Sequence, residues 1–392
     1  MADYQNVLLA EVKDQERFCG DTTFLETAVA YAVKKVEEIM PDFVHSFPSP
    51  SSVNLMYGEE DDSEWTCGFW TGMLWLSYEL TGNELYRAVA EAQYDDYKKR
   101  YKTYHVLNHH DIGFLYIPSI VAQYKLTGGK KAKKLALGAA KILANRYSEK
   151  AGIIQVRDRD QQGHFIIDCS MNIPLLYWAA LETGDRSFYL KALNHMNQAA
   201  GCMVREDAST YQCFKIDEIT GQPVRGWQGQ GYSDDSCWAR GQAWIIYGLA
   251  ISYRYTKETT FLEMAKRVSN YFLNHLPSDL ICNWDLIFTE DEVQRDSSSA
   301  PVAACGLLEI AEYLPETDLH KKLYYNAAVS ILRNLAERYT TEGEHSNGIL
   351  MHGVYCKDKG NGGWGDDECC IWGDYFYMEG LRRLKGNWNM YW

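Results

Sequence analysis

The chain has 392 residues, of which 46% are hydrophobic, 14% aromatic and 23% charged, so it can fold around a large core. Thirty-nine Lys and Arg against 53 Asp and Glu give a net charge of −14, which disfavours binding to nucleic acid or to an anionic membrane surface. Residues 1–18 lack the basic end and apolar run of a signal peptide, and no later stretch is apolar enough to span a bilayer. We therefore expect a cytoplasmic protein with neither a nucleic-acid nor a membrane partner.

Apolar residues recur at helical spacing along the whole chain, and no series of short alternating segments predicts a sheet. Almost wholly apolar segments alternate with amphipathic ones that carry Lys, Glu and Arg on one side. The apolar segments are 68–80, 112–126, 170–182, 238–255, 299–314 and 371–384. Their amphipathic partners begin near Thr22, Glu84, Lys130, Arg186, Thr260 and Leu319.

Several apolar segments end alike, with Y-E-L-T-G-N at 78–83, Y-K-L-T-G-G at 124–129, L-E-T-G-D at 181–185 and, more loosely, Y-R-Y-T-K-E at 253–258. Glycine suits the left-handed residue that ends a helix, so these motifs predict tight turns between helices. Six apolar helices alternating with six amphipathic ones predict an all-α protein, an (α/α)6 barrel that is a single domain over 1–392. The long connections then meet at the rim opposite the tight turns, where we expect the function.

Two aspartates stand before apolar segments at this rim, Asp111 ahead of I-G-F-L-Y and Asp168 ahead of C-S-M-N-I-P-L-L. Each could be an N-cap, because an aspartate oxygen accepts hydrogen bonds from the free amides of a helix N-terminus. They also precede neighbouring inner helices and would face one mouth together. A carboxyl pair can divide into a protonated acid and an ionised partner, which is the arrangement that acid/base chemistry on sugars needs.

Aromatic residues are frequent at the rim ends of the inner helices, and a flat ring suits the face of a sugar. Trp65 and Phe69 are four residues apart on one helix face, as a packed pair or as a stacking platform. Arg240 and Trp244 have the same spacing in a helix otherwise too apolar for a guanidinium. A buried arginine needs a carboxylate partner, and Asp235 and an anionic substrate are both open as that partner.

Other chemistries find little support. The glycines at 360, 362 and 365 formally fit G-x-G-x-x-G, but acidic residues follow them and no strand–helix–strand unit surrounds them. His109, His110 and Asp111 are adjacent and lack a second ligand set, and the eleven cysteines include no C-x-x-C pair. We therefore expect no metal and no cofactor. Reduced thiols fit a cytoplasmic chain better than the alternative, a disulfide-bonded extracytoplasmic protein.

From about Trp65 to its C-terminus, the chain resembles the unsaturated glucuronyl hydrolases of glycoside hydrolase family 88. The motifs that carry the resemblance are H-H-D-I-G-F-L-Y at 109–116, F-I-I-D-C-S-M-N-I-P-L-L at 165–176, Q-G-Y-S-D-D-S-C-W-A-R-G-Q-A-W at 230–244 and I-W-G-D-Y-F-Y at 371–377. The resemblance implies the same six-hairpin barrel. It also implies hydration of the double bond in the 4,5-unsaturated uronic acid that polysaccharide lyases leave on hyaluronan, chondroitin or related fragments.

The resemblance further implies a role for each matching residue. Asp168 would protonate C4 and then help water to add at C5, while Asp111 would hold the ring hydroxyls and keep Asp168 protonated. Trp65, Phe69 and Trp244 would stack on the two sugar rings. His110, Gln230 and Arg240 would hydrogen-bond the uronate or the water, and Tyr355 would close the site. The partner is then an unsaturated uronate-containing di- or oligosaccharide, bound by a monomer or a homodimer.

The chain departs from the family pattern at two places. Gln212 stands where the family often has a histidine, so a proton-transfer role at this position is in doubt. The loop after Tyr355 reads C-K-D-K-G-N and lacks the Ser-x-x-Ser-x-Lys pattern that resembles a sulfate site in other members. A thiol is a poor donor to sulfate, and Asp358 opposes an anion near Lys357 and Lys359. We therefore predict no preference for 6-sulfated substrates.

Three other functions stay open. An unsaturated rhamnogalacturonyl hydrolase would share the barrel and the hydration chemistry and differ in the second sugar. A sugar epimerase on the same barrel would rely on a histidine pair, whereas this rim is richer in aspartate. A glycan-binding toroid without activity is the third. Loss of absorbance at the unsaturated uronate band distinguishes hydration from epimerisation and from binding.

Overall fold

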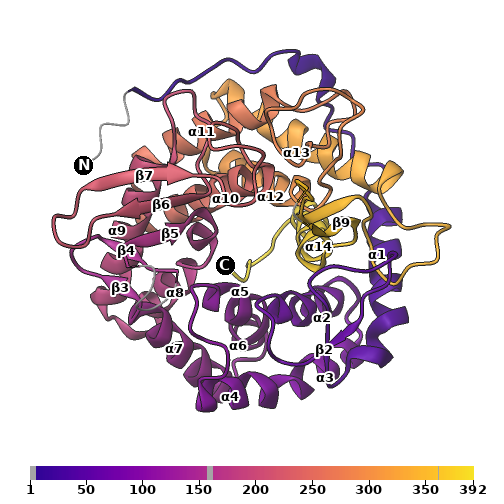
Figure 1. The fold of residues 1–392 in the computed structure, drawn as a ribbon. Coiled ribbons are helices and arrows are strands. Elements are labelled where there is room, and N and C mark those ends of the chain that lie inside the picture. Colours follow the sequence, from indigo (N-terminus) through magenta and orange to yellow (C-terminus); the bar gives the residue numbers. More distant parts are fainter. Residues whose placement is uncertain (1–5, 157–161, 361) are drawn as a thin grey trace.

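The protein is a closed ring of helices in two layers, seen end-on in Figure 1. The computed structural model describes residues 6–156, 162–360 and 362–392. The inner layer consists of α2 (Cys67–Thr81), α5 (Ile112–Tyr116) with α6 (Ala122–Thr127), α8 (Pro174–Thr183), α10 (Ala239–Thr256), α12 (Ala300–Tyr313) and α14 (Ile371–Leu384). The outer layer consists of α1 (Leu25–Ile39), α3 (Glu84–Ala92) with α4 (Tyr94–Thr103), α7 (Lys130–Ala144), α9 (Arg186–Met203), α11 (Thr259–Asn274) and α13 (Leu319–Arg338).

Burial follows the pattern that the sequence predicts. In α2 every residue from Cys67 to Ser77 is buried, and in α12 every residue from Ala300 to Ala311. The outer helix α11 instead buries only part of its surface, and Thr259, Thr260 and Glu263 are exposed. A helix that is apolar all round must be enclosed, whereas an amphipathic one covers it. The chain is therefore an (α/α)6 barrel, as predicted.

The tight turns between inner and outer helices also match the prediction. Gly82, Gly128 and Gly184 end α2, α6 and α8 in the left-handed conformation, with φ of 71°, 69° and 74°. Lys257 ends α10 in the same way, with φ of 59°. A Cβ is disfavoured at positive φ, which explains glycine at three of the four turns.

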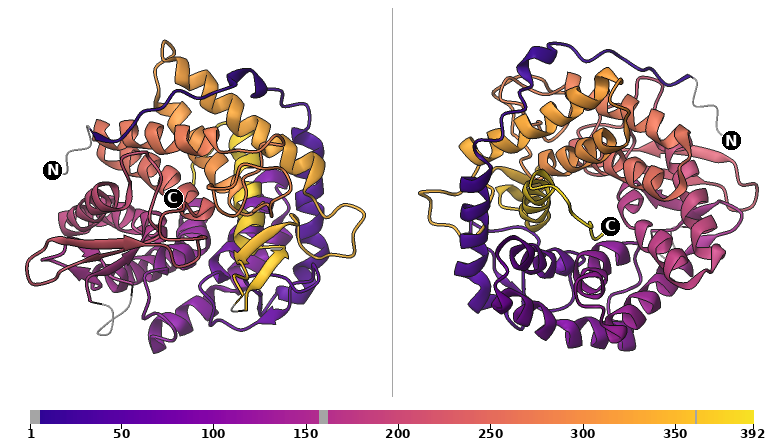
Figure 2. Two further views of the ribbon diagram at one scale, coloured as in Figure 1. Left: turned by 45° about the horizontal axis from the view of Figure 1, so that its top comes forward. Right: turned by 180° about the vertical axis from the view of Figure 1, so that it is seen from behind.

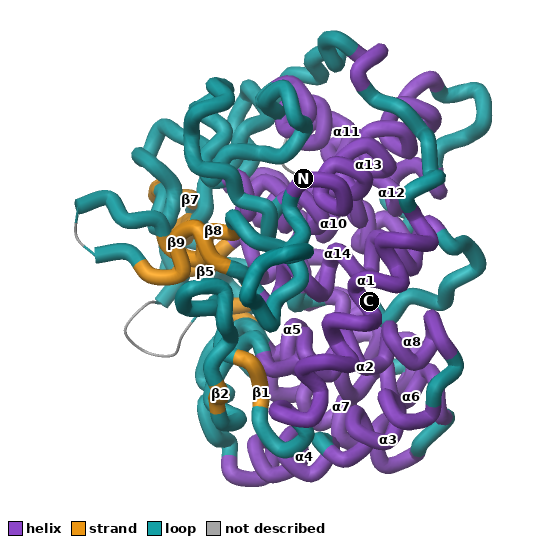
Figure 3. The backbone as a smooth tube through the Cα atoms, turned by 90° about the vertical axis from the view of Figure 1, so that its right-hand side faces the viewer, coloured by secondary structure: helices purple, strands orange, loops and turns teal. Residues whose placement is uncertain are grey.

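The expectation of no sheet is wrong for the long connections, which form short antiparallel strands at one end of the barrel (Figure 3). The strands are β1 (Phe47–Pro48), β2 (Glu59–Glu60), β3 (Tyr147–Ser148), β4 (Ile153–Ile154), β5 (His164–Ile166), β6 (Cys213–Ile216), β7 (Pro223–Trp227), β8 (Gly353–Cys356) and β9 (Trp364–Glu368). Such short strands show too few alternations to be recognised in the sequence. Among them, β5, β6 and β7 form one sheet that joins two separate connections.

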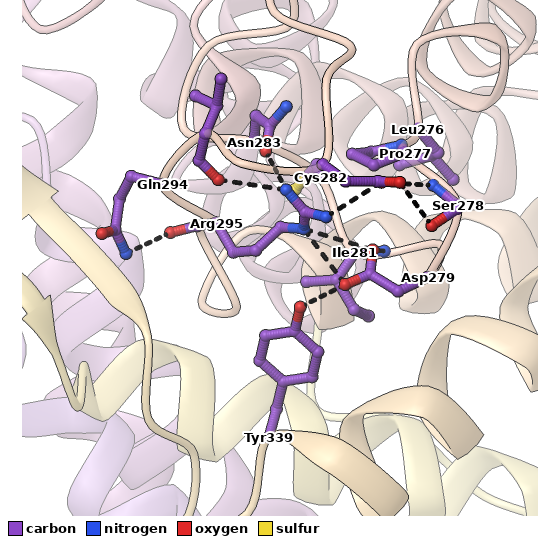
Figure 4. A network of polar contacts seen from close by, with 12 residues as sticks. Leu276, Pro277, Ser278, Asp279, Ile281, Cys282, Asn283, Gln294, Arg295 and Tyr339 are labelled. Carbon is purple, nitrogen blue, oxygen red and sulfur yellow. Dashed lines mark hydrogen bonds and ion pairs between the residues drawn. The ribbon is translucent and has the colours of Figure 1, made fainter.

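A network of polar contacts around Arg295 holds the connection between α11 and α12 (Figure 4). Arg295 pairs with Asp279 at 3.2 Å and Asp291 at 3.3 Å, and it donates to Asn283 Oδ1 at 2.6 Å. The Tyr339 hydroxyl donates to Asp279 Oδ2 from the end of α13. The carboxylate partners of Arg295 are thus all structural, which leaves this rim segment fixed.

The segment 385–392 turns back from α14 into the middle of the ring (Figures 1 and 2). Trp392 stacks on Phe376 with a centroid distance of 5.7 Å, and its Nε1 donates to Glu379 Oε2 at 2.7 Å. The Tyr391 hydroxyl donates to Glu79 on α2. The central hole of the barrel is therefore filled by aromatic side chains.

All eleven cysteines are free thiols in the structure. Within the described ranges, no helix is both long and apolar enough to cross a membrane.

Candidate active site

Asp111 and Asp168 come together at the strand-bearing end of the barrel through Asn172. Asp111 immediately precedes α5, and Asp168 lies in the 3-10 turn η5 (Ile167–Met171) ahead of α8. Asn172 Nδ2 donates to Asp111 Oδ1 at 3.3 Å and to the Asp168 carbonyl at 3.2 Å, while its Oδ1 accepts the Phe114 N–H at 2.8 Å. One buried amide therefore ties both aspartate segments together.

The structure does not support the N-cap interpretation for either aspartate. Asp111 occupies the N-cap position of α5, but its side chain makes no capping hydrogen bond. Asp168 is inside η5, whose N-cap is Ile166, and α8 begins only at Pro174. Neither carboxyl therefore has the stabilising role that an N-cap aspartate usually has.

The two carboxyls have opposite electrostatic environments. Burial and the nearby charge of Asp111 raise the pKa of Asp168 to about 7, although Arg240 acts against them. Burial also opposes the charge on Asp111, but His110, His109 and Asn172 outweigh it and lower the pKa of Asp111 below its usual value. Among the described residues, the buried Oδ1 of Asp168 has no hydrogen-bond partner. The pair is thus one protonated acid beside one carboxylate near neutral pH.

Two histidines flank Asp111. His110 Nε2 lies 3.2 Å from Asp111 Oδ1, and His109 Nδ1 lies 3.5 Å from Asp111 Oδ2. Burial lowers the pKa of His110, so this imidazole is neutral at pH 7. In the part of the chain that is described, no three His, Cys, Asp or Glu side chains are grouped to hold a metal ion.

Aromatic rings form the floor of the site. Trp65 is partly exposed, stacks on Trp372 at 5.6 Å and donates from Nε1 to the Tyr355 hydroxyl at 2.7 Å. Phe69 and Trp244 have no exposed surface. Phe114 lies against both of them, at 5.3 and 5.0 Å. Of the three predicted stacking rings, only Trp65 therefore presents surface to a ligand.

Arg240 is only 2% exposed, and Asp235, one of the two partners left open by the sequence, is not among its contacts. Its guanidinium donates to the carbonyls of Val354 at 2.6 Å and Tyr355 at 2.9 Å. It also lies over the rings of Trp238 at 4.3 Å and Trp372 at 4.6 Å. Asp235 is exposed, so of the two alternatives the internal aspartate is wrong, and backbone carbonyls and aromatic faces hold the guanidinium instead.

Gln230 belongs to the same cluster. Its Nε2 donates to the Tyr355 carbonyl at 2.7 Å, and its Oε1 accepts hydrogen bonds from Gln212 Nε2 at 3.0 Å and Arg240 Nη2 at 3.4 Å. The structure thus brings all nine predicted site residues to one end of the barrel.

Sequence reasoning missed Asn172 and Phe114, although both lie in the quoted motifs. An asparagine between Met171 and Ile173, in an otherwise apolar stretch, was the available signal, because a buried amide needs partners.

Comparisons with known proteins agree with this geometry. The chain matches Glycosyl Hydrolase Family 88 over residues 35–355. It is 42% identical to an unsaturated chondroitin disaccharide hydrolase of Streptococcus pneumoniae, covering 99% of this chain and 100% of that protein. It is 39% identical to an unsaturated glucuronyl hydrolase of Bacillus sp. strain GL1, covering 94% and 98%.

Solved structures show the same fold. The unsaturated glucuronyl hydrolase of Streptococcus agalactiae superposes with a TM-score of 0.94 at 39% identity, covering 98% of this chain and 99% of that one. An aspartate-to-asparagine variant of that enzyme, complexed with dGlcA-GalNAc6S, superposes with a TM-score of 0.88 at 38% identity and the same coverage. The chain therefore belongs to glycosyl hydrolase family 88.

Proposed function

We propose that this chain hydrolyses unsaturated disaccharides and short oligosaccharides that polysaccharide lyases release from glycosaminoglycans. The observation that carries the proposal is the buried, unpartnered oxygen of Asp168, on a carboxyl whose pKa is raised to about 7, next to ionised Asp111. A carboxyl in this state can donate a proton at neutral pH and then act as a base. The names of the relatives supply the substrate class.

In the proposed reaction, Asp168 donates its proton to C4 of the 4,5-unsaturated uronate, and positive charge develops at C5. Water adds at C5 and returns a proton to the Asp168 carboxylate. The resulting hemiketal opens to a ketone, and the former ring oxygen becomes a hydroxyl on C1. C1 then expels the adjacent sugar as an alcohol. Asp111 holds the ring hydroxyls and keeps Asp168 protonated by its charge.

Substrate binding falls to the side chains around the aspartates. Trp65 offers a face to the sugar and Tyr355 closes the site, while His110, Gln230 and Arg240 bind the uronate or the water. Phe69 packs against Trp65 and Phe114, and Trp244 packs against Phe114. Because neither Phe69 nor Trp244 has exposed surface, their stacking on the sugar requires neighbouring rings to move.

The test is the absorbance of the unsaturated uronate band with unsaturated disaccharides from hyaluronan, chondroitin and heparin. Hydration removes the band, and we expect turnover of at least one of the three. An unchanged band with all three would contradict the proposal and favour an epimerase or a glycan-binding toroid. Turnover of unsaturated rhamnogalacturonyl disaccharide alone would place the chain with the rhamnogalacturonyl hydrolases.

We also propose that unsulfated disaccharides are turned over at least as efficiently as 6-sulfated ones. Lys357 pairs with Asp366 at 2.8 Å, and Lys359 Nζ donates to the Gly231 carbonyl at 2.8 Å, so both ammonium groups already have partners. The test compares kcat/KM for the two substrates in the wild type and in Lys359→Ala. A preference for the sulfated substrate that Lys359→Ala removes would make this lysine a sulfate ligand.

We also propose that the chain is one domain, that it is cytoplasmic and that it is a monomer or a homodimer. The continuous ring of helices supports the single domain, and the eleven free thiols support the cytoplasmic location. Sedimentation analysis tests the oligomeric state.

A further inference from the structure

Gln212 lies between the segment that carries Asp168 and the turn that carries Gln230. It immediately precedes β6 and is only 5% exposed. Its backbone carbonyl accepts the N–H of Ile167, the neighbour of Asp168, at 2.9 Å. The backbone of Gln212 is thus fixed to the aspartate segment, and its side chain bonds the turn that carries Gln230.

The Gln212 carboxamide makes three hydrogen bonds to that turn. Its Oε1 accepts the backbone N–H groups of Gly229 at 2.9 Å and Gln230 at 2.5 Å. Its Nε2 donates to Gln230 Oε1 at 3.0 Å. Both acceptor positions of the oxygen are used, and the amide donor fixes which end of the Gln230 side chain faces Gln212.

The contacts continue from Gln230 to the rest of the site. Because Gln230 Oε1 faces Gln212, its Nε2 is free to donate to the Tyr355 carbonyl. The same carbonyl accepts from Arg240, and the Tyr355 hydroxyl accepts from Trp65. The orientation of one buried amide therefore affects the placement of Tyr355, which bonds Gln230 and Arg240 through its carbonyl and Trp65 through its hydroxyl.

We propose that Gln212 is a positioning residue for this reaction: it locks the 229–231 turn and the Gln230 carboxamide to the segment that carries Asp168. The inference rests on the proposed function. A carboxamide is the side chain that accepts two N–H groups and also donates one. Glutamate keeps the acceptors but loses the donor and adds a charge, and methionine keeps the shape but loses all three bonds.

The experiment compares Gln212→Met, Gln212→Glu and the control Gln93→Met on the unsaturated disaccharide that the wild type turns over. Gln93 is also a buried glutamine, with its Nε2 donating to the Phe43 carbonyl and its Oε1 accepting from Thr71, outside the site. Both methionine variants lose buried hydrogen bonds, so both lose thermal stability. Activity is therefore measured per folded molecule at a temperature well below each Tm.

We expect Gln212→Met to lower kcat/KM about tenfold, mostly by raising KM, with the pH limits of activity unchanged, because about two net hydrogen bonds stop holding the turn. Gln212→Glu is expected to raise KM as well. Its added negative charge raises the pKa of Asp168 and moves the alkaline limit of kcat/KM upward. Gln93→Met is expected to keep both kcat and KM.

A kcat/KM of Gln212→Met within twofold of that of Gln93→Met would overturn the inference. If Gln212→Met does not fold, Gln212→Glu decides. This variant retains the two bonds to the turn backbone and loses only the donor to Gln230 Oε1. An unchanged KM and an unchanged pH profile in this variant would overturn the inference. Failure of the proposed function itself looks different, because the wild type would then leave the unsaturated band unchanged.

Discussion

Asp168 and Asp374 are two largely buried aspartates whose pKa burial raises to about 7, but their surroundings differ. Asp374, on α14, accepts hydrogen bonds from the Tyr57 hydroxyl at 2.9 Å and from the backbone N–H groups of Ile349 at 3.0 Å and Leu350 at 2.9 Å. Asp168 has a buried oxygen without a partner in the described residues, and the charge of Asp111 beside it. A raised pKa alone thus does not mark a catalytic acid.

The difference separates a structural carboxyl from a reactive one. The three donors around Asp374 join α14 to Tyr57, between β1 and β2, and to the segment before β8, and Asp374 is only 1% exposed. Asp168 instead has a buried oxygen without a hydrogen-bond partner among the described residues. Such a group costs stability unless a ligand or a reaction uses it.

The largest expected effect is the loss of activity when Asp168 is replaced by asparagine, with Asp374→Asn as the matched control. Asp168→Asn should lower kcat by about a thousandfold or more, because an amide keeps the shape but donates no catalytic proton. Asp374→Asn should keep kcat per folded molecule and lose stability of about 2 kcal/mol, since an amide nitrogen cannot accept the hydrogen bonds of Asp374. Initial rates and chemical denaturation measure both. Near-normal turnover in Asp168→Asn would refute the assignment.

Asp111→Asn should also impair kcat severely, through loss of the second carboxylate. Removing its charge lowers the pKa of Asp168 as well, so the residual activity should fall at a lower pH than in the wild type. Rate measurements across pH test this. If the variant keeps its rate and loses only about 1 kcal/mol of stability, the catalytic role of Asp111 is wrong.

The pH dependence of kcat/KM should have an alkaline limit near pH 7, because Asp168 must be protonated to act as an acid and its pKa is about 7. The acid limit should lie below the usual pKa of an aspartate, since Asp111 must be ionised and His110, His109 and Asn172 lower its pKa. Asp374→Asn should leave the alkaline limit in place. A shift of that limit in this variant would give Asp374 the role assigned to Asp168.

The smallest effect concerns stability. A carboxyl whose pKa rises on folding favours folding only while it is protonated, so Asp168 destabilises the fold increasingly as pH rises from about 4 to about 7. Asp168→Asn removes this penalty and should have a higher Tm than the wild type at pH 8 and a similar Tm at pH 4. Calorimetry at both values tests the sign. A lower Tm at pH 8 would show that Asp168 is stabilised by partners.

The sequence predicts the helices well because each inner segment must be apolar all round and each outer one amphipathic, and the left-handed turns follow from Gly82, Gly128 and Gly184. The strands escape prediction because they are short and form only by pairing distant loops, as β5 does with β6. The partners of Arg240 could not be predicted either, because the amino-acid sequence does not show which backbone carbonyls will lie within reach of a guanidinium.

The tryptophans of the aromatic floor also allow substrate binding to be followed by intrinsic fluorescence. Trp65 is partly exposed, stacks on Trp372 and contacts Phe114, whose ring in turn contacts Trp244 and Trp392. A sugar placed on Trp65 changes the polarity and the quenching around coupled indoles. The intrinsic fluorescence of the inactive Asp168→Asn variant can therefore titrate substrate affinity directly, without a label and without turnover.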